Sequence, residues 1–221
     1  MKKTILALAL CSLSVMGVVT KSSAQVKEGS ITYLTSAQNL PPEYAAMGEG
    51  EMKVTFKNGK TRIDNNSAMG TMILITDGKG NALTLMEGPM GKMYIKSDLK
   101  KDTMKEPPAP KITYVDEKKT VAGYECKKAL VEMKTASGAV ETKTFWYTEK
   151  IAPPDGKYSG KMAVPGLKGV PLEFEMKQMG YTVKYTATAV STSAVPDAKF
   201  EQSTEGYTEM DPNMMKGMGG Q

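Results

Sequence analysis

The segment MKVTFKNGKTRID, residues 52–64, decides the fold class of this 221-residue chain. Its first half alternates apolar with polar side chains, a period of two that is typical of a β-strand with one buried face. Asn58 and Gly59 follow, and both residue types accept the positive φ that a two-residue hairpin turn requires. The segment therefore predicts two antiparallel strands joined by a tight turn.

A second hairpin is predicted near the end of the chain. Residues 172–176 and 181–189 alternate apolar with polar side chains, and Gln178-Met179-Gly180 joins them. Apolar runs or alternation bounded by turn residues predict further strands at residues 29–35, 71–76, 82–86, 92–96, 111–115, 120–135 and 141–150. The unbroken apolar run at 72–75 predicts a strand covered on both faces. Many strands with little helix predict a mainly β chain whose curved antiparallel sheet forms a half-barrel.

Three segments depart from this pattern. Residues 99–111 are rich in Lys and Pro and lack a period, which predicts an exposed crossover between two sheet halves. Within residues 120–135 the apolar phase changes between Cys126 and Ala129, which predicts a bulge or a break into two strands. Residues 42–47 begin with Pro and predict a short helix.

The first 24 residues predict a secretory signal peptide. Lys2 and Lys3 precede a mostly apolar run, and Ser22-Ser23-Ala24 offers small residues for cleavage after Ala24. Cys11 is a poor lipidation site because Leu10 before it is larger than a lipobox residue typically is. The chain is therefore predicted to be exported to the periplasm or the extracellular space, with no transmembrane segment after the leader.

Removal of the leader changes the composition from which function is inferred. The leader holds three lysines and no acidic residue, so the formal net charge falls from +5 to +2. This weak charge and the single arginine, Arg62, do not predict nucleic-acid binding. The absence of histidine excludes Ser-His-Asp and Cys-His catalysis and histidine-ligated zinc. Cys126 remains as a single cysteine and is interpreted as a small buried apolar residue rather than a reactive thiol.

Five sequence blocks, in their order along the chain, resemble a known family. They are MKVTFKNGKTRID (52–64), ALTLMEGPMGKMYIK (82–96), KKTVAGYECKKALVEM (118–133), FWYTEKI (145–151) and GLKGVPLEFEM (166–176). They are similar to an exported bacterial domain family of unknown function, common in Bacteroidetes-type bacteria and related by fold to the LolA/LolB lipoprotein carriers. The resemblance implies one LolA-like half-barrel domain at 25–209, with an apolar concave face that can hold acyl chains. We expect the Met- and Gly-rich residues 210–221 to form a flexible tail.

Methionine is unusually frequent, with 18 residues in the chain, and it supports two hypotheses. In the first, flexible side chains on the concave face bind a lipid or an acyl chain, with core filling as the alternative. The residues assigned to this site are Met52, Val54, Phe56, Met86, Met93, Trp146, Phe174, Met176 and Tyr185. In the second, thioether sulfur binds Cu(I). Its candidate ligands are the tail residues Met210, Met214, Met215 and Met218.

A third hypothesis is an envelope interaction module that recognises a protein partner through an exposed sheet edge. Catalysis has less support, because Glu173 and Glu175 lie on the polar face of a clean alternation, as expected of a solvated strand face. The sequence thus favours a monomeric, non-enzymatic protein that binds an apolar ligand and needs no cofactor.

Overall fold

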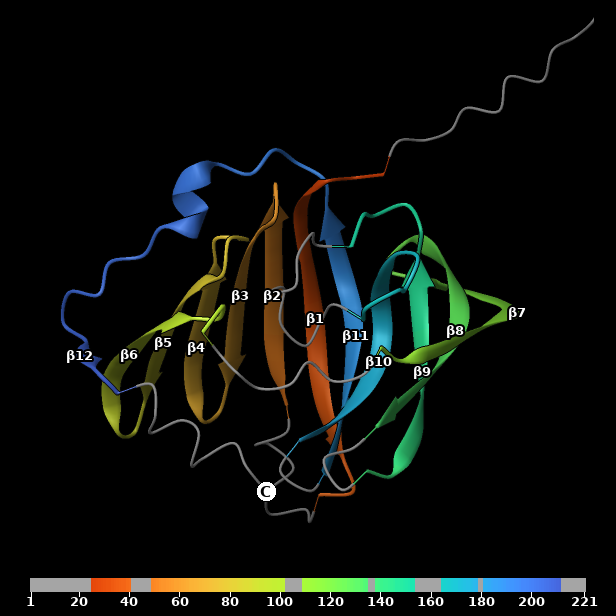
Figure 1. The fold of residues 1–221 in the computed structure, drawn as a ribbon, viewed down its shortest axis with the longest axis horizontal. Coiled ribbons are helices and arrows are strands. Elements are labelled where there is room, and N and C mark those ends of the chain that lie inside the picture. The colour runs from red at the N-terminus through yellow and green to blue at the C-terminus, as the bar shows by residue number, and fades with distance from the viewer. Residues whose placement is uncertain are drawn as a thin grey trace, which may run out of the picture.

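The computed structural model describes residues 25–40, 49–101, 109–134, 138–153, 164–178 and 181–211. Here the chain is almost entirely β-structure, arranged as one open, curved sheet (Figure 1). The strands are β1 (Glu28–Gln38), β2 (Gly50–Lys57), β3 (Lys60–Ser67), β4 (Gly70–Thr76), β5 (Asn81–Gly88), β6 (Gly91–Asp98), β7 (Lys111–Val121), β8 (Tyr124–Lys134), β9 (Val140–Thr148), β10 (Val170–Gln178), β11 (Tyr181–Ser191) and β12 (Thr208–Glu209). The described ranges add one short 3-10 helix, η3 (Asp197–Phe200). The predicted mainly β class, with a curved antiparallel sheet, is confirmed.

The order of strands in the sheet is β12-β6-β5-β4-β3-β2-β1-β11-β10-β9-β8-β7. Strands β1 to β6 form one meander, β7 to β11 form a second, and the pairing of β1 with β11 joins them. These pairs are antiparallel, whereas β12 runs parallel to β6 at the sheet edge. The chain therefore passes from β6, next to the edge strand β12, to β7 at the opposite edge, which confirms the predicted division into two sheet halves.

Both predicted hairpins are confirmed. Asn58 and Gly59 have φ values of 50° and 79°, and Lys57 pairs with Lys60 across the turn. These two positive values are those that a two-residue turn between twisted strands requires. The second hairpin is seen in the antiparallel pairing of β10 with β11.

The predicted strand boundaries at 111–115 and 120–135 are wrong, because residues 120–121 belong to the earlier strand. β7 ends at Val121 and β8 begins at Tyr124, because Ala122 and Gly123 form a turn with φ values of 48° and 79°. Alanine seldom adopts a positive φ, since its Cβ is crowded there, so this turn lacks the usual Asn-Gly or Asp-Gly signal.

The predicted change of phase in β8 is confirmed, and it takes the form of a bulge. Cys126 and Ala129 are both buried, although an undistorted strand would turn them to opposite faces. β8 itself is continuous, and the irregularity lies in its partner, where the register shifts between Val115 and Lys118 of β7. The extra residues of β7 bend the pair, so that β8 turns different faces to the core along its length.

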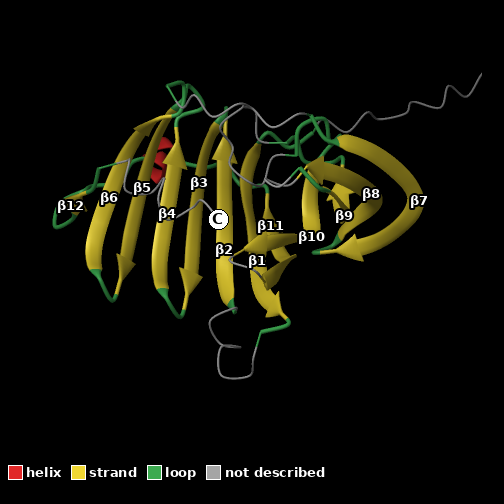
Figure 2. Ribbon diagram, turned by 60° about the horizontal axis from the view of Figure 1, so that its bottom comes forward, coloured by secondary structure: helices red, strands yellow, loops and turns green. Residues whose placement is uncertain are grey.

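The half formed by β7–β11 curls until β7 reaches β11, and the curl encloses the main hydrophobic core (Figure 2). We call the side of the sheet that faces into the curl the inner face, and the opposite side the outer face. Val164 and Leu167, in the segment before β10, add to this core. Tyr114 of β7 holds that segment in place by donating a hydrogen bond to the carbonyl of Gly166 at 3.2 Å.

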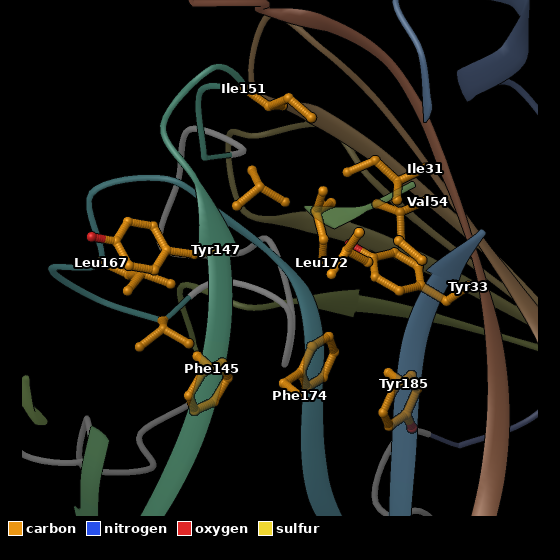
Figure 3. Packing of buried hydrophobic residues seen from close by; sticks show 14 of the residues in the cluster. Ile31, Tyr33, Val54, Phe145, Tyr147, Ile151, Leu167, Leu172, Phe174 and Tyr185 are labelled. Atoms are coloured by element: carbon orange, nitrogen blue, oxygen red, sulfur yellow. The ribbon is translucent and has the colours of Figure 1, made fainter. Parts of the chain in front are cut away.

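Aromatic rings form the centre of the core (Figure 3). Phe174 stacks on Phe145 and on Tyr185, with ring centroids 5.7 and 4.8 Å apart. Tyr33 meets Phe174 edge-on at 6.0 Å, and its buried hydroxyl donates a hydrogen bond to the carbonyl of Pro171 at 2.8 Å. The interior of the curl is thus packed with side chains from both halves of the chain.

The segment that follows β11 crosses the outer face of β3 to β6, shown in blue in Figure 1. Arg62 of β3 donates a hydrogen bond to the carbonyl of Lys199 at 3.2 Å, and the amide of Met210 donates to the carbonyl of Tyr94 at 2.9 Å. Neither η3 nor β12 was predicted from the sequence, because both are held mainly by these long-range contacts.

β4 was expected to be buried on both faces, and this is confirmed only at its C-terminal end. Ile75 on the outer face and Thr76 on the inner face are buried, whereas the side chain of Met72 is 37% exposed. The predicted leader, the predicted helix at 42–47 and the tail methionines beyond Met210 lie outside the described residues. No helix in the described part of the chain is long and apolar enough to cross a membrane.

Candidate functional site

Strands β9 and β10 separate before they end. Their ladder stops at the pair Phe145–Phe174. Beyond this pair β9 stays bonded to β8 and β10 to β11, but no ladder pair in the described chain joins residues 140–144 to residues 175–178. Within the described residues, the backbone donors and acceptors on the two facing edges therefore have no strand partner, an arrangement that can accept another strand or a polar ligand group.

A pocket of about 550 Å³ occupies this gap between β9 and β10, a size typical of natural ligand sites. Three of the nine predicted residues line it, namely Trp146, Phe174 and Met176. Phe174 and Met176 belong to the inner face and Trp146 to the outer face, so the gap joins the two sides of the sheet. The other lining residues are polar or charged: Glu141, Thr142, Lys143, Thr144, Glu173, Glu175, Lys177 and Thr182.

Ion pairs fix the charged side chains around the gap. Lys177 of β10 reaches Glu141 of β9 at 2.5 Å, and this hydrogen bond holds the pKa of the Glu141 carboxyl below its ordinary value. Burial opposes ionisation of Glu173, but hydrogen bonds from Lys119 and Lys184, at 2.7 and 3.3 Å, hold its pKa below the ordinary value as well. The rim therefore carries paired charges of both signs at neutral pH.

Trp146 stands on the outer face under two lysines. The ammonium groups of Lys119 and Lys128 lie 4.4 and 5.8 Å from its ring centroid, within the range of cation–π attraction. The strand period predicts that Trp146 faces away from Phe145 and Tyr147, and the register confirms it. Trp146 lines the pocket because the gap opens to the outer face, and it does not lie on the concave face.

The structure does not bring the other six predicted ligand-binding residues to the gap. Met52, Val54, Phe56 and Tyr185 are buried in the core. The remaining two, Met86 and Met93, are half-buried on β5 and β6, in the opposite half of the sheet. Sequence alternation is right about the inner face for eight of the nine residues and wrong for Trp146, which lies on the outer face. It also cannot tell which inner-face residues a folded chain leaves accessible.

A second hollow, of about 500 Å³, lies on the outer face under the segment that follows β11. Its lining is mostly polar, and its guanidinium, Arg62, is already held by Asp64 at 2.7 Å and by Gln202 at 3.2 Å. Because these groups satisfy one another, this hollow is less suited to an apolar ligand than the gap between β9 and β10.

The single cysteine of the described chain is buried and shielded. Burial raises the pKa of the Cys126 thiol to about 11, which keeps it in the unreactive protonated form. In the described residues, no group of three or more Cys, Asp or Glu side chains is arranged to hold a metal ion. The interpretation of Cys126 as a small buried residue is consistent with these observations.

The raised thiol pKa leads to a prediction for alkaline pH. Because the folded pKa exceeds the ordinary value of 9.0, the protonated thiol stabilises the fold fully below about pH 9, and this contribution is lost as the pH rises towards 11. We expect Cys126→Ala to flatten the fall in melting temperature over that window, measured by circular dichroism. An unchanged alkaline slope in the variant would show that other groups cause the fall.

The family of the chain follows from a family model that matches residues 42–205 and is described as a domain of unknown function, DUF4412. The chain belongs to the DUF4412 family. The match runs from before β2 to beyond η3, leaving out β1 and β12, and it confirms the predicted membership of a family of unknown function. No curated protein gives a significant match to this DUF4412 chain.

Solved structures similar to the DUF4412 chain share little sequence with it. LprF from Mycobacterium bovis is 10% identical, with a TM-score of 0.35 over 76% of this chain and 88% of that one. A putative outer membrane lipoprotein-sorting protein domain from Vibrio parahaemolyticus is 7% identical, with a TM-score of 0.32 over 79% and 89%. MucB in complex with MucA(peri) is 12% identical, with a TM-score of 0.37 over 82% of this chain and 55% of that one.

Proposed function

We propose that this DUF4412 protein is an exported, non-enzymatic binding protein for an amphiphile with a hydrocarbon chain, such as a lipid or a lipoprotein acyl chain. The pocket in the gap between β9 and β10 carries the proposal, because it combines three large apolar side chains with unpaired backbone groups. A cleaved leader ahead of a single domain at 25–209 would place this site in the periplasm or outside the cell.

The chemistry of the gap suits a ligand with two different ends. Phe174, Met176 and the ring of Trp146 offer an apolar surface that a hydrocarbon chain can cover. The N–H and C=O groups of β9 and β10 that face the gap lie outside the β9–β10 ladder and would be costly to bury against hydrocarbon alone. An ester, amide or hydroxyl group in the head of an amphiphile can satisfy them, beside a rim that the ion pairs of Lys143 and Lys177 with Glu141 keep polar.

Methionine contributes to this site through its adaptability. Met176 is half-buried and packs against the core, and its unbranched side chain can change rotamer to admit ligands of different shape. The aromatic stack behind it, centred on Phe174, provides a fixed wall. The expected selectivity is for an apolar chain with a polar head rather than for one particular lipid.

The only tryptophan of the chain, Trp146, allows a direct test. We expect a fatty acid brominated along its chain to quench Trp146 fluorescence in a saturable manner, whereas Met176→Asp weakens binding by about tenfold or more, because a charge would enter the apolar side of the gap. Met72→Asp, in the other half of the sheet, is the matched control and should bind as the wild type does. Absence of saturable quenching, or equal loss in both folded variants, would contradict the proposal.

The unpaired strand edges also support a second candidate function, the recognition of an extended peptide by strand addition. A peptide would bond to residues 140–144 or 175–178 through its backbone and leave the hydrocarbon surface largely uncovered. Native mass spectrometry of protein purified from its own compartment separates the two candidates. Co-purified fatty-acyl masses released by organic solvent favour the amphiphile, and a peptide mass favours strand addition.

A further inference from the structure

A row of methionines crosses the inner face in the half of the sheet that the proposed amphiphile site does not use. Seven residues stand directly opposite one another in a line across the sheet from β1 to β12: Tyr33, Met52, Asn65, Met72, Met86, Met93 and Thr208. Its last three methionines are consecutive, on β4, β5 and β6. We call these three residues the methionine row.

The methionine row is placed so that its sulfur atoms can converge. Residues directly opposite in an antiparallel pair have Cβ atoms about 4.5–5.5 Å apart, and methionine adds three rotatable bonds to that spacing. Met72 is 37% exposed, and Met86 and Met93 are half-buried, so none of the three residues is sealed in the core. Met52, in contrast, is buried in the core and separated from the row by Asn65.

The neighbours of the row along β4, β5 and β6 are small or uncharged. On the side of the hairpin tips, the next positions are Gly70, Gly88 and Gly91, which carry no side chain to cover the sulfur atoms. On the other side, the next positions are neutral: Leu74, Thr84 and Ile95. None of these six residues offers the carboxylate oxygens that hard cations such as Mg²⁺ or Ca²⁺ require.

The end of β12 brings one more thioether to the edge of the row. Glu209 and Tyr94 share the outer face, where their side chains form a hydrogen bond of 2.8 Å. Strand alternation therefore directs Met210, the next residue, to the side of Met93. The amide of Met210 donates to the carbonyl of Tyr94, which holds this residue against β6.

From this geometry we infer that Met72, Met86 and Met93 form a binding site for Cu(I), with Met210 as a fourth ligand from the edge. Thioether sulfur is a soft ligand that selects Cu(I) over Zn²⁺, Mg²⁺ and Ca²⁺. A site made of neutral ligands leaves the single positive charge of the ion uncompensated, and the exposure of Met72 lets solvent screen that charge. The site is independent of the proposed amphiphile pocket, which lies in the other half of the sheet.

The test is an anaerobic titration of the chain from residue 25 onward with Cu(I), in competition with a chromogenic Cu(I) chelator. We expect one tightly held ion per chain, and a loss of affinity of about tenfold or more in Met86→Leu, which removes the central ligand with little change in volume. The triple variant at Met72, Met86 and Met93 should abolish competition with the chelator. Met176→Leu, at the amphiphile pocket, is the matched control and should bind Cu(I) as the wild type does.

Two outcomes would overturn the inference. One is a wild-type chain that fails to compete for Cu(I). The other is a folded triple variant that retains full affinity while leucine substitutions at Met214, Met215 and Met218 remove it, because binding would then reside in the tail alone. Far-ultraviolet circular dichroism and melting temperature verify that each variant is folded before its affinity is interpreted.

Discussion

Replacing Phe174 with alanine is expected to lower the free energy of unfolding by about 3–5 kcal/mol, the range typical of a buried Phe truncated in a core. Phe174 is buried and contacts three other rings, those of Tyr33, Phe145 and Tyr185. Its removal would leave a cavity where the two halves of the chain meet, because Tyr33 belongs to the first half. Urea denaturation followed by circular dichroism measures the effect.

Controls separate the loss of ring packing from a general effect of substitution. Phe174→Leu keeps most of the volume and should cost less than half as much as the alanine variant. Trp146→Phe, on the outer face beside Phe145, removes a larger ring but opens no cavity in the core, and should cost under about 1 kcal/mol. A cost for Phe174→Ala below that of Trp146→Phe would show that the stack does not stabilise the fold.

Gly70→Ala is expected to destabilise the protein by about 2–4 kcal/mol, combining backbone strain with a steric clash. Gly70 has a φ of 126°, and a Cβ there would lie 2.0 Å from the carbonyl oxygen of Glu87. The turn between β3 and β4 would have to move away from the end of β5. Thermal unfolding measures the loss in stability, and the same displacement should weaken Cu(I) binding, because Met72 follows two residues later.

Gly91→Ala is the matched control for this substitution. Gly91 also has a positive φ, 100°, but a Cβ there would have no heavy atom within 4 Å. It therefore tests backbone strain without the clash, and we expect a cost of about 1 kcal/mol. Equal losses in the two variants would mean that the contact with Glu87 adds nothing to the cost.

The features that the sequence predicts well are those that short-range chemistry determines. The Asn58-Gly59 turn and the alternation on either side of it specify a hairpin without reference to the rest of the chain. The change of phase between Cys126 and Ala129 was likewise visible as a local irregularity. Its location in the partner strand was not, because the register of β7 against β8 is a property of two segments.

The features that the sequence could not predict depend on distant parts of the chain. The positive φ of Ala122 is imposed by its hairpin, and β12 exists because β6 offers it a free edge. The end of the ladder at Phe145–Phe174 has no sequence signal either. Without this gap, nothing distinguishes Trp146 and Met176, which line the pocket, from the other apolar residues among the nine predicted to bind the ligand.

The bulge between Val115 and Lys118 has a consequence for aggregation of the protein. β7 is an outer strand of the sheet, and a flat, apolar outer strand is a template on which further copies of a protein can add and form fibrils. The bulge interrupts the regular spacing of β7, and charged residues at positions 116–119 occupy the same stretch. We therefore expect the distortion that bends the β7–β8 pair also to hinder the addition of further copies at this edge.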